Sequence, residues 1–196
     1  MIYFCVLDFE ATCWDDDSIP RHKMEIIEFP SILYKLIDNN LEYISKFHYY
    51  VKPVVYPKLS NFCINLTGIK QNTIDNAESF SSVYKKHIEW LKTYITEQDE
   101  LYFVTCGDWD FSKIFPNELK NKKIIKDPIY KYYINIKKEF EYFYKKKISG
   151  MIQMLSSLKL PMIGKHHSGI DDTTNIAQIL VKIVNDGHLD FFINEI

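Results

Sequence analysis

The 196-residue sequence predicts a mixed α/β fold in which three antiparallel strands come first and strands then alternate with helices. Three observations predict this class: an apolar run at residues 2–7, two β-rich runs at 24–37 and 41–53, and a helical pattern at 80–95. Consecutive strands followed by strand–helix alternation are typical of a sheet layer covered by helices. We therefore expect one mixed sheet with helices packed against it.

The predicted strands come mainly from the first quarter of the chain. Residues 2–7, IYFCVL, are uniformly apolar, which is typical of a central strand covered on both faces. The runs 24–37 and 41–53 flank Asp38-Asn39-Asn40, a turn signal, and together predict a hairpin beside the first strand. We expect residues 54–76 to form a loop with short turns.

The rest of the chain shows helical periodicity around one further strand. Positions 80, 83, 84, 87, 88, 91, 94 and 95 fall on one face of a helix. LYFVTC at 101–106 predicts a short buried strand, and WDFSKIF at 109–115 turns directly into helix. Weak helical periodicity continues to about residue 147, and helices are expected around 149–158 and 172–185.

Composition indicates one globular domain over residues 1–196. Hydrophobic residues make up 46% of the chain and charged residues 26%, as in ordinary globular proteins. No apolar run approaches the ~20 residues of a membrane span, and the N-terminus lacks the basic region of a signal peptide. The four cysteines form no C-x-x-C pair and are interpreted as reduced thiols. We expect an intracellular protein of the cytoplasm or nucleus, with no membrane partner.

The net charge of −2 conceals an uneven distribution. Residues 112–147 contain 11 lysines and four acidic residues, so the rest of the chain is acidic. A basic segment that also carries aromatic residues suits a phosphate-binding surface next to an acidic metal site. The alternative is a solvated lysine face. On either interpretation, most aromatic side chains of this segment are expected to lie in the core.

Asp8 and Glu10 form the first candidate site. They follow the apolar strand directly, and residues i and i+2 of an extended chain point to the same side. Two adjacent carboxylates repel each other unless a cation lies between them, and hard oxygen ligands favour Mg²⁺ or Mn²⁺. The placement at the end of a buried strand therefore predicts a metal site.

A second candidate site lies in HHSGIDD at 166–172. Ile176, Ile179 and Ile183 follow Asp172 at helical spacing, which places Asp172 on the apolar face of the helix. Asp171 shares its face with polar residues and is expected to face water or cap the helix. A buried carboxylate needs a partner, which is either a metal or a lysine. His167 precedes this helix and could reach the same site.

GDWDFSKIF at 107–115 supplies the third candidate. Asp110 and Ile114 are separated by four residues, which directs Asp110 inward if this segment is helical. Asp108 could instead cap that helix. We therefore prefer Asp110 as the functional carboxylate of this segment.

LDFEAT, GDWDFSKIF and HHSGIDD, in this order, resemble the three motifs of the DEDDh 3'-to-5' exonucleases. MEIIEFPSIL (24–33) and LSNFCINLTGI (59–69) are similar to the enhanced-RNAi and histone-mRNA 3' exonuclease branch of that family, and the resemblance covers essentially the whole chain. It implies an RNase H-like fold with a central mixed five-stranded sheet. Residues 1–196 would then form a single exonuclease catalytic domain.

The resemblance also implies residue roles. Metal ligands fall on Asp8, Glu10, Asp110 and Asp172, which would hold two Mg²⁺ ions that Mn²⁺ can replace. His167 falls on the general base, and Glu10 belongs to the catalytic set. The residues expected to contact the substrate are Glu10, Ala11, Leu66, Thr67, Trp109 and His167.

The expected activity is 3'-to-5' hydrolysis of single-stranded RNA or RNA overhangs with release of nucleoside 5'-monophosphates. Two alternatives stay open: a 3'-to-5' exonuclease acting on DNA, and a module that binds RNA without cutting it. The metal chemistry of the first alternative would be the same, and recognition of the 2'-hydroxyl would separate the two nucleases. A binding module of this kind usually lacks one of the carboxylates.

Overall fold

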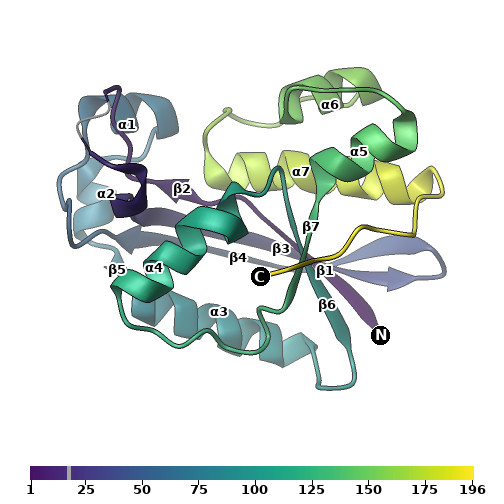
Figure 1. Ribbon diagram of the computed structural model, residues 1–196, viewed down its shortest axis with the longest axis horizontal. Helices are drawn as coiled ribbons and strands as arrows, with labels where there is room; N and C mark the ends of the chain where they lie inside the picture. Colours follow the sequence, from purple (N-terminus) through teal and green to yellow (C-terminus); the bar gives the residue numbers. More distant parts are fainter. Residues whose placement is uncertain (17–18) are drawn as a thin grey trace.

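The computed structural model describes residues 1–16 and 19–196, which form a mixed sheet covered by helices on both faces (Figure 1). Within these residues the strand order is β5-β4-β3-β1-β6-β7-β8, and β2 pairs with β3. The strands are β1 (Ile2–Leu7), β2 (Glu10–Ala11), β3 (Ile26–Ile37), β4 (Asn40–Lys52), β5 (Glu78–Ser79), β6 (Glu100–Thr105), β7 (Tyr132–Asn135) and β8 (Asn194–Glu195). The five longer strands, β4-β3-β1-β6-β7, form the expected five-stranded centre, and β2, β5 and β8 are two-residue additions.

β1 separates the two halves of the hydrophobic core. Tyr3, Cys5 and Leu7 point to one face of the sheet and Phe4 and Val6 to the other, as the alternation of an extended strand requires. Both faces are covered, which explains why the whole run is apolar. β1 pairs antiparallel with β3 and parallel with β6, so the predicted position and environment of this strand are confirmed.

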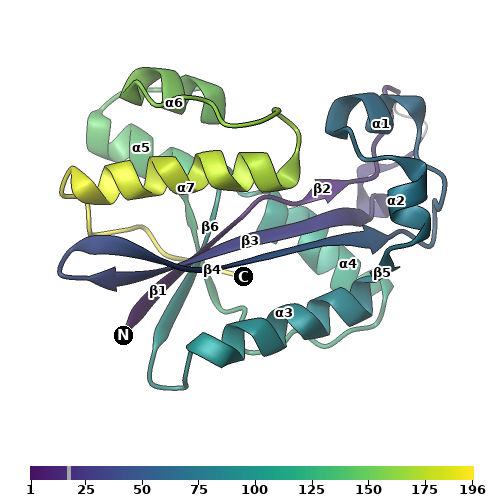
Figure 2. The same cartoon turned by 180° about the vertical axis from the view of Figure 1, so that it is seen from behind.

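The helices divide between the two sheet faces. Figures 1 and 2 show α5, α6 and α7 on one face, α3 and α4 on the other, and α1 and α2 at the end of the sheet. The helical segments are η1 (Arg21–Lys23), α1 (Asn61–Thr67), α2 (Gln71–Asp75), α3 (Phe80–Tyr94), η2 (Asp110–Ile114), α4 (Phe115–Asn121), α5 (Ile136–Tyr144), α6 (Met151–Leu158) and α7 (Gly169–Asn185).

The predicted hairpin forms as β3 and β4, paired antiparallel over most of their length. Asp38 and Asn39 have φ values of 48° and 63°. Asn and Asp tolerate this left-handed conformation better than most residues, so the turn forms at the predicted position.

Three segments differ from the sequence prediction. Residues 54–76, predicted as a loop, contain the short helices α1 and α2. The lysine-rich stretch, predicted as weakly helical, includes the strand β7, which pairs parallel with β6. α7 begins at Gly169 rather than near residue 172. These elements are short or depend on distant partners, so local periodicity is a weak signal for them.

Over residues 1–16 and 19–196, none of the helices is long and apolar enough to cross a lipid bilayer.

Candidate active site

Three carboxylates from distant segments meet beside the end of β1. Asp8 follows the last residue of β1, Glu10 begins β2, and Asp172 lies in the first turn of α7. One carboxylate oxygen from each side chain lies within 4.8 Å of the other two. Asp172 is 3% exposed and Glu10 is 9% exposed. The structure therefore brings together the predicted acidic residues of the first and third motifs.

Asp110 lies next to this group because β6 runs parallel to β1. The carboxyl ends of parallel neighbours reach the same edge of the sheet, and the π-helical turn η2 begins directly after that edge. The Asp110 Oδ1 atom accepts a hydrogen bond from the Phe9 backbone N–H at 3.0 Å. Asp110 is buried at 5% exposure, as its helical spacing predicted.

All four carboxyl groups have raised pKa values, and burial is the largest cause of each shift. The pKa of Glu10 is raised to about 9 and that of Asp110 to about 6. Burial and the nearby Asp110 and Glu10 raise the pKa of Asp8 well above its usual value. Burial also raises the pKa of Asp172, against the hydrogen bond that it accepts from the His167 backbone. A positive group at this place would relieve the repulsion.

The first turn of α7 packs very closely against the end of β1. A Cβ atom added at Gly169 would lie 3.0 Å from the Asp8 carbonyl oxygen and 3.0 Å from Glu28 Oε2. Any larger residue at this position would therefore force these neighbours to move, and glycine is the residue that fits without such a shift. This close approach brings Asp172 from α7 to Asp8.

Glu28, which the sequence reasoning missed, fixes the start of α7 from within the sheet. Its carboxylate accepts the backbone N–H groups of Gly169 and Ile170 at 2.9 and 3.1 Å. It also bonds His48 Nε2 at 2.8 Å. Negative charge at a helix N-terminus is stabilising. Glu28 pairs in register with Glu10, but its helix partners are 141 residues away, so no local pattern could have indicated this role.

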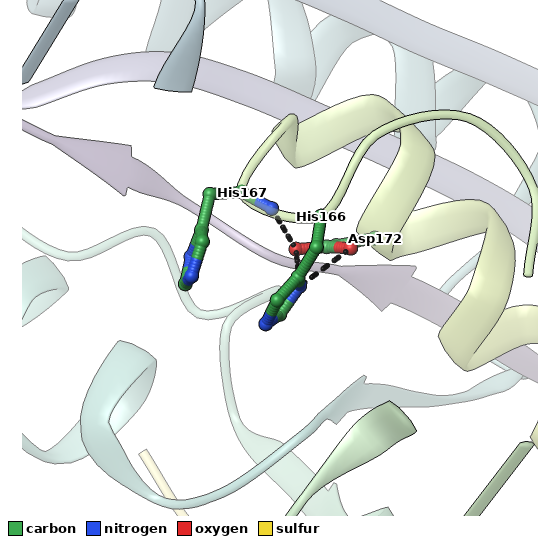
Figure 3. Close-up of side chains that lie close together, drawn as sticks. All are labelled: His166, His167 and Asp172. Atoms are coloured by element: carbon green, nitrogen blue, oxygen red, sulfur yellow. Dashed lines mark hydrogen bonds and ion pairs between the residues drawn. The ribbon is translucent and has the colours of Figure 1, made fainter. Parts of the chain in front are cut away.

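The loop before α7 brings two histidines to Asp172 (Figure 3). The His167 backbone N–H donates to Asp172 Oδ2 at 2.8 Å, and His166 Nδ1 lies 2.9 Å from the same oxygen. The two imidazole rings stack with centroids 3.9 Å apart. Burial lowers the pKa of His167, and His166 lowers it further. Sequence reasoning singled out His167 and missed His166, although both stand in the HHSG segment.

The partner of Asp172 is a histidine rather than the lysine considered from the sequence. Asp171 does not simply face water, because its Oδ2 atom accepts the Lys165 backbone N–H at 2.9 Å. Asn175, one of the polar residues on the same helix face as Asp171, is fully buried, and its side chain forms hydrogen bonds with the backbone N–H and C=O of Ile163. The loop at 159–168 folds over this side of α7 and covers it.

Asp108 does not belong to the carboxylate group. It accepts hydrogen bonds from Tyr133 and Asn135 at 3.0 Å each and pairs with Lys138 at 2.9 Å. Burial alone would raise its pKa, but these three donors outweigh it and lower the pKa. Its side chain makes no capping bond to the following helix, so the capping alternative is wrong.

The residues predicted to contact the substrate differ in how far their side chains are buried or already hydrogen-bonded. Ala11 is buried, and its carbonyl oxygen lies 3.7 Å from Cys63 Sγ. The Thr67 hydroxyl is engaged within α1, donating to Cys63 O at 2.8 Å. Leu66 is half-buried, and Trp109 is 36% exposed. Of these four residues, Trp109 and Leu66 keep exposed side-chain surface.

The lysine-rich segment extends well beyond the site. Lys145, Lys146 and Lys147 follow α5 at the far end of α7, where Tyr144 donates to Asp186 at 2.6 Å. Asp186 follows Asp172 by fourteen residues of helix, roughly 20 Å at 1.5 Å per residue. Among the eight aromatic residues of the segment, those buried in the core are Phe115, Tyr130, Tyr133 and Phe140.

The donor set fits a divalent metal centre. Across residues 1–16 and 19–196, no lysine or arginine forms an ion pair with Asp8, Glu10, Asp110 or Asp172, and His166 is the one pairing partner, at Asp172. Buried carboxylates without a cation of the protein are suited to a hard ion that prefers oxygen ligands. The geometry and the raised pKa values both point to such an ion.

Comparison with known proteins gives a consistent result. The family model described as Exonuclease matches residues 5–180. The human protein 3'-5' exoribonuclease 1 is 39% identical over 188 residues, covering 94% of this chain and 53% of the human protein. The Drosophila melanogaster 3'-5' exonuclease Snipper is 33% identical over 201 residues, covering 95% of this chain and 71% of the fly protein.

A solved structure agrees over nearly the whole chain. The nuclease domain of 3'hExo, a DEDDh family member bound to rAMP, has a TM-score of 0.89 and 36% identity, covering 99% of this chain and 97% of that one. The fold and the acidic edge are those of the RNase H-like class of nuclease domains. The chain belongs to the exonuclease family and, within it, to the DEDDh branch that includes 3'hExo. It spans about half the length of human 3'-5' exoribonuclease 1.

Proposed function

We propose that this chain is a 3'-to-5' exoribonuclease that removes nucleoside 5'-monophosphates one at a time from single-stranded 3' ends or overhangs. The observation that carries the proposal is the group of Asp8, Glu10 and Asp172 oxygens within 4.8 Å of one another, with His167 beside Asp172. Residues 1–196 would act as a single catalytic domain. Similarity to human 3'-5' exoribonuclease 1 and to the rAMP-bound 3'hExo domain supports RNA as the substrate.

Asp8, Glu10, Asp110 and Asp172 would hold two Mg²⁺ ions, which Mn²⁺ can replace. When bound, the ions supply an activated water and neutralise charge on the departing 3'-oxygen. Asp8 would be the central ligand of the set, because each of the other three carboxylates raises its pKa. Asp110 is oriented by the Phe9 N–H, and Asp172 is oriented by the His167 N–H.

His167 would accept the proton of the attacking water. An ordinary imidazole is mostly neutral at pH 7, and burial together with His166 lowers the pKa of His167 further. Its lone pair is therefore available at working pH. As water attacks phosphorus, the bond to the 3'-oxygen breaks. The terminal nucleotide would leave with a 5'-phosphate, and the departing 3'-oxygen would take up a proton from solvent, so that the shortened strand ends in a 3'-hydroxyl.

The terminal nucleotide would lie between Glu10–Ala11 and α1, with Leu66 against its base or sugar. Trp109, 36% exposed at the start of η2, would offer a stacking surface to an unpaired base. Lys165, which precedes the two histidines, would place a positive charge beside this nucleotide. Its Nζ atom reaches from the histidine loop to α1, where it donates to the Asn65 carbonyl at 3.0 Å. The 2'-hydroxyl would distinguish RNA from DNA.

The direct test uses RNA and DNA oligonucleotides of one sequence, labelled at either end, with Mg²⁺ or with EDTA. The expected result is a ladder of 5'-labelled RNA fragments and release of the 3' label as mononucleotide, with no cutting in EDTA. Cutting of DNA alone would make the chain a DNA exonuclease. Intact RNA that remains bound would make it a binding module. We expect the activity in the cytoplasm or nucleus, where free thiols such as its four cysteines persist.

A second experiment isolates the role of His167. Replacing His167 by Gln should lower kcat by about 100-fold or more, the range of general acid–base catalysis. The activity of the unchanged protein should rise with pH around a midpoint below pH 6.5, because the pKa of His167 lies under its ordinary value. A variant with nearly normal kcat, or an unchanged pH profile in the variant, would remove His167 from the base role.

A further inference from the structure

Two imidazoles and a carboxylate gather in one place at the start of α7 (Figure 3). One ligand atom from each of His166, His167 and Asp172 lies within 4.8 Å of the other two. We propose that these three residues form a site for Zn²⁺, which shares Asp172 with the Mg²⁺ site and differs from it in its two histidine ligands, and that zinc bound there inhibits the chain. The binding part of this inference is independent of the proposed function, and the inhibition rests on it.

The backbone explains why neighbouring histidines point the same way. In an extended chain, adjacent side chains point to opposite sides. His167 instead has a φ of 67°, a left-handed conformation that non-glycine residues rarely adopt. Figure 3 shows both rings on the same side of the loop, beside Asp172. Strained backbone of this kind persists where surrounding contacts impose it, and the bond from His167 N–H to Asp172 is one such contact.

The donor types favour zinc over magnesium. Imidazole nitrogens suit Zn²⁺, whereas carboxylates and water suit Mg²⁺ and Mn²⁺. Two histidines and one carboxylate with a fourth position left to water are a common zinc arrangement. The carboxylate group at Asp8 and Glu10 contains no imidazole, so the two sites would select different ions while sharing Asp172.

The distances between His166 and Asp172 are close to those of a zinc site, and the His167 ligand atom lies within 4.8 Å of both. Bonds of roughly 2.0–2.1 Å in a tetrahedron separate the ligand atoms by roughly 3.3 Å. His166 Nδ1 lies 2.9 and 3.2 Å from the two Asp172 oxygens. The stacked rings must splay for both nitrogens to face one ion. The His166 side chain, 37% exposed, has the freedom to turn outward.

Zinc at this site would act on two parts of the proposed machinery at once. A His167 nitrogen that binds the ion cannot take a proton from water, and Asp172 would be shared between two cations. Zinc should therefore inhibit in the presence of excess Mg²⁺. His166 decides this sensitivity, because it is the one zinc ligand that is neither a proposed Mg²⁺ ligand nor the proposed base.

The test begins with zinc binding to the full chain in the absence of RNA. Zn²⁺ is titrated against a chromophoric chelator in millimolar Mg²⁺, and we expect one zinc ion per chain. His166→Gln should weaken binding at least 10-fold, since changes to groups that only support a ligand cost about 10- to 100-fold. His166→Cys, which keeps a zinc ligand, should bind more tightly than the Gln variant. His22→Gln, which changes an exposed histidine outside the site, is the matched control and should leave binding unchanged.

The activity arm measures the zinc concentration for half inhibition, relative to the zinc-free rate of each variant. That concentration should rise at least 10-fold in His166→Gln. Absence of stoichiometric binding, or equal binding by the unchanged chain and the Gln variant, would overturn the proposal. So would zinc binding that Asp8→Asn removes and His166→Gln does not, because the ion would then lie in the carboxylate group. Zinc binding as expected by a chain that cuts no RNA would refute the nuclease proposal and leave the zinc site standing.

Discussion

Replacing Glu10 by Gln should abolish activity and yet stabilise the metal-free fold. Burial and neighbouring carboxylates raise the pKa of Glu10 from 4.5 to about 9, so at pH 7 the folded state holds a proton that the unfolded state releases. Each pH unit between 4.5 and 7 then costs about 1.4 kcal/mol of stability, or about 3 kcal/mol in all. The amide variant has no such cost, and its metal-free form should be more stable by about that amount at pH 7.

The assay is urea unfolding in EDTA, followed by tryptophan fluorescence from pH 4 to pH 8. The raised pKa determines the direction of the pH dependence. The extra stability of the Gln variant should be near zero at pH 4, where Glu10 is protonated in both the folded and the unfolded state of the unchanged chain, and it should grow as the pH rises. Mg²⁺ should stabilise the unchanged chain and have much less effect on the variant, because the ion binds the folded state. Activity should fall by about 100-fold or more, as when other preorganised electrostatic groups are removed.

Glu28→Gln is the matched control for this prediction. Glu28 pairs with Glu10 in register, but its carboxylate accepts two N–H groups of α7 and bonds His48. Its replacement should therefore destabilise the fold at pH 7, by about 1–3 kcal/mol for a charged hydrogen-bonding group. A Glu10→Gln variant that is less stable than the unchanged chain in EDTA, or whose gain does not depend on pH, would refute the reasoning.

Asp8→Asn should lower kcat by about 100-fold or more in an RNA cleavage assay, and near-normal turnover would remove Asp8 from the site. His87 is fully buried, and burial lowers its pKa to about 3. The stability that depends on its neutral form is complete above pH 6.5 and declines as the pH falls towards 3. From pH 6.5 to 5 the free energy of unfolding, measured with urea, should fall by about 2 kcal/mol more in the unchanged chain than in His87→Gln. Equal decreases would contradict the lowered pKa of His87. Replacing the lysines at 145–147 together by Gln should reduce the salt dependence of RNA binding, whereas an unchanged slope would identify them as a solvated face.

The sequence by itself was sufficient for the features that repeat over short distances. The unbroken run in β1, the turn at Asp38-Asn39 and the amphipathic face of α3 each depend on neighbouring residues. The inward direction of Asp172 follows from isoleucines within three turns of the same helix. The burial of this carboxylate could therefore be predicted before any tertiary contact was known.

The tertiary structure decided everything that depends on which segments meet. β7 has only four residues, which is too short for periodicity to distinguish a strand from a helix. It becomes a strand because it pairs with β6. Glu28 reaches α7 across 141 residues. His166 differs from an ordinary loop histidine because its Nδ1 atom lies 2.9 Å from Asp172 Oδ2, a contact that the loop sequence does not indicate. Local periodicity determines which face of an element is apolar. The position of one element against another is set by close packing and long-range hydrogen bonds, and these decided the composition of the site.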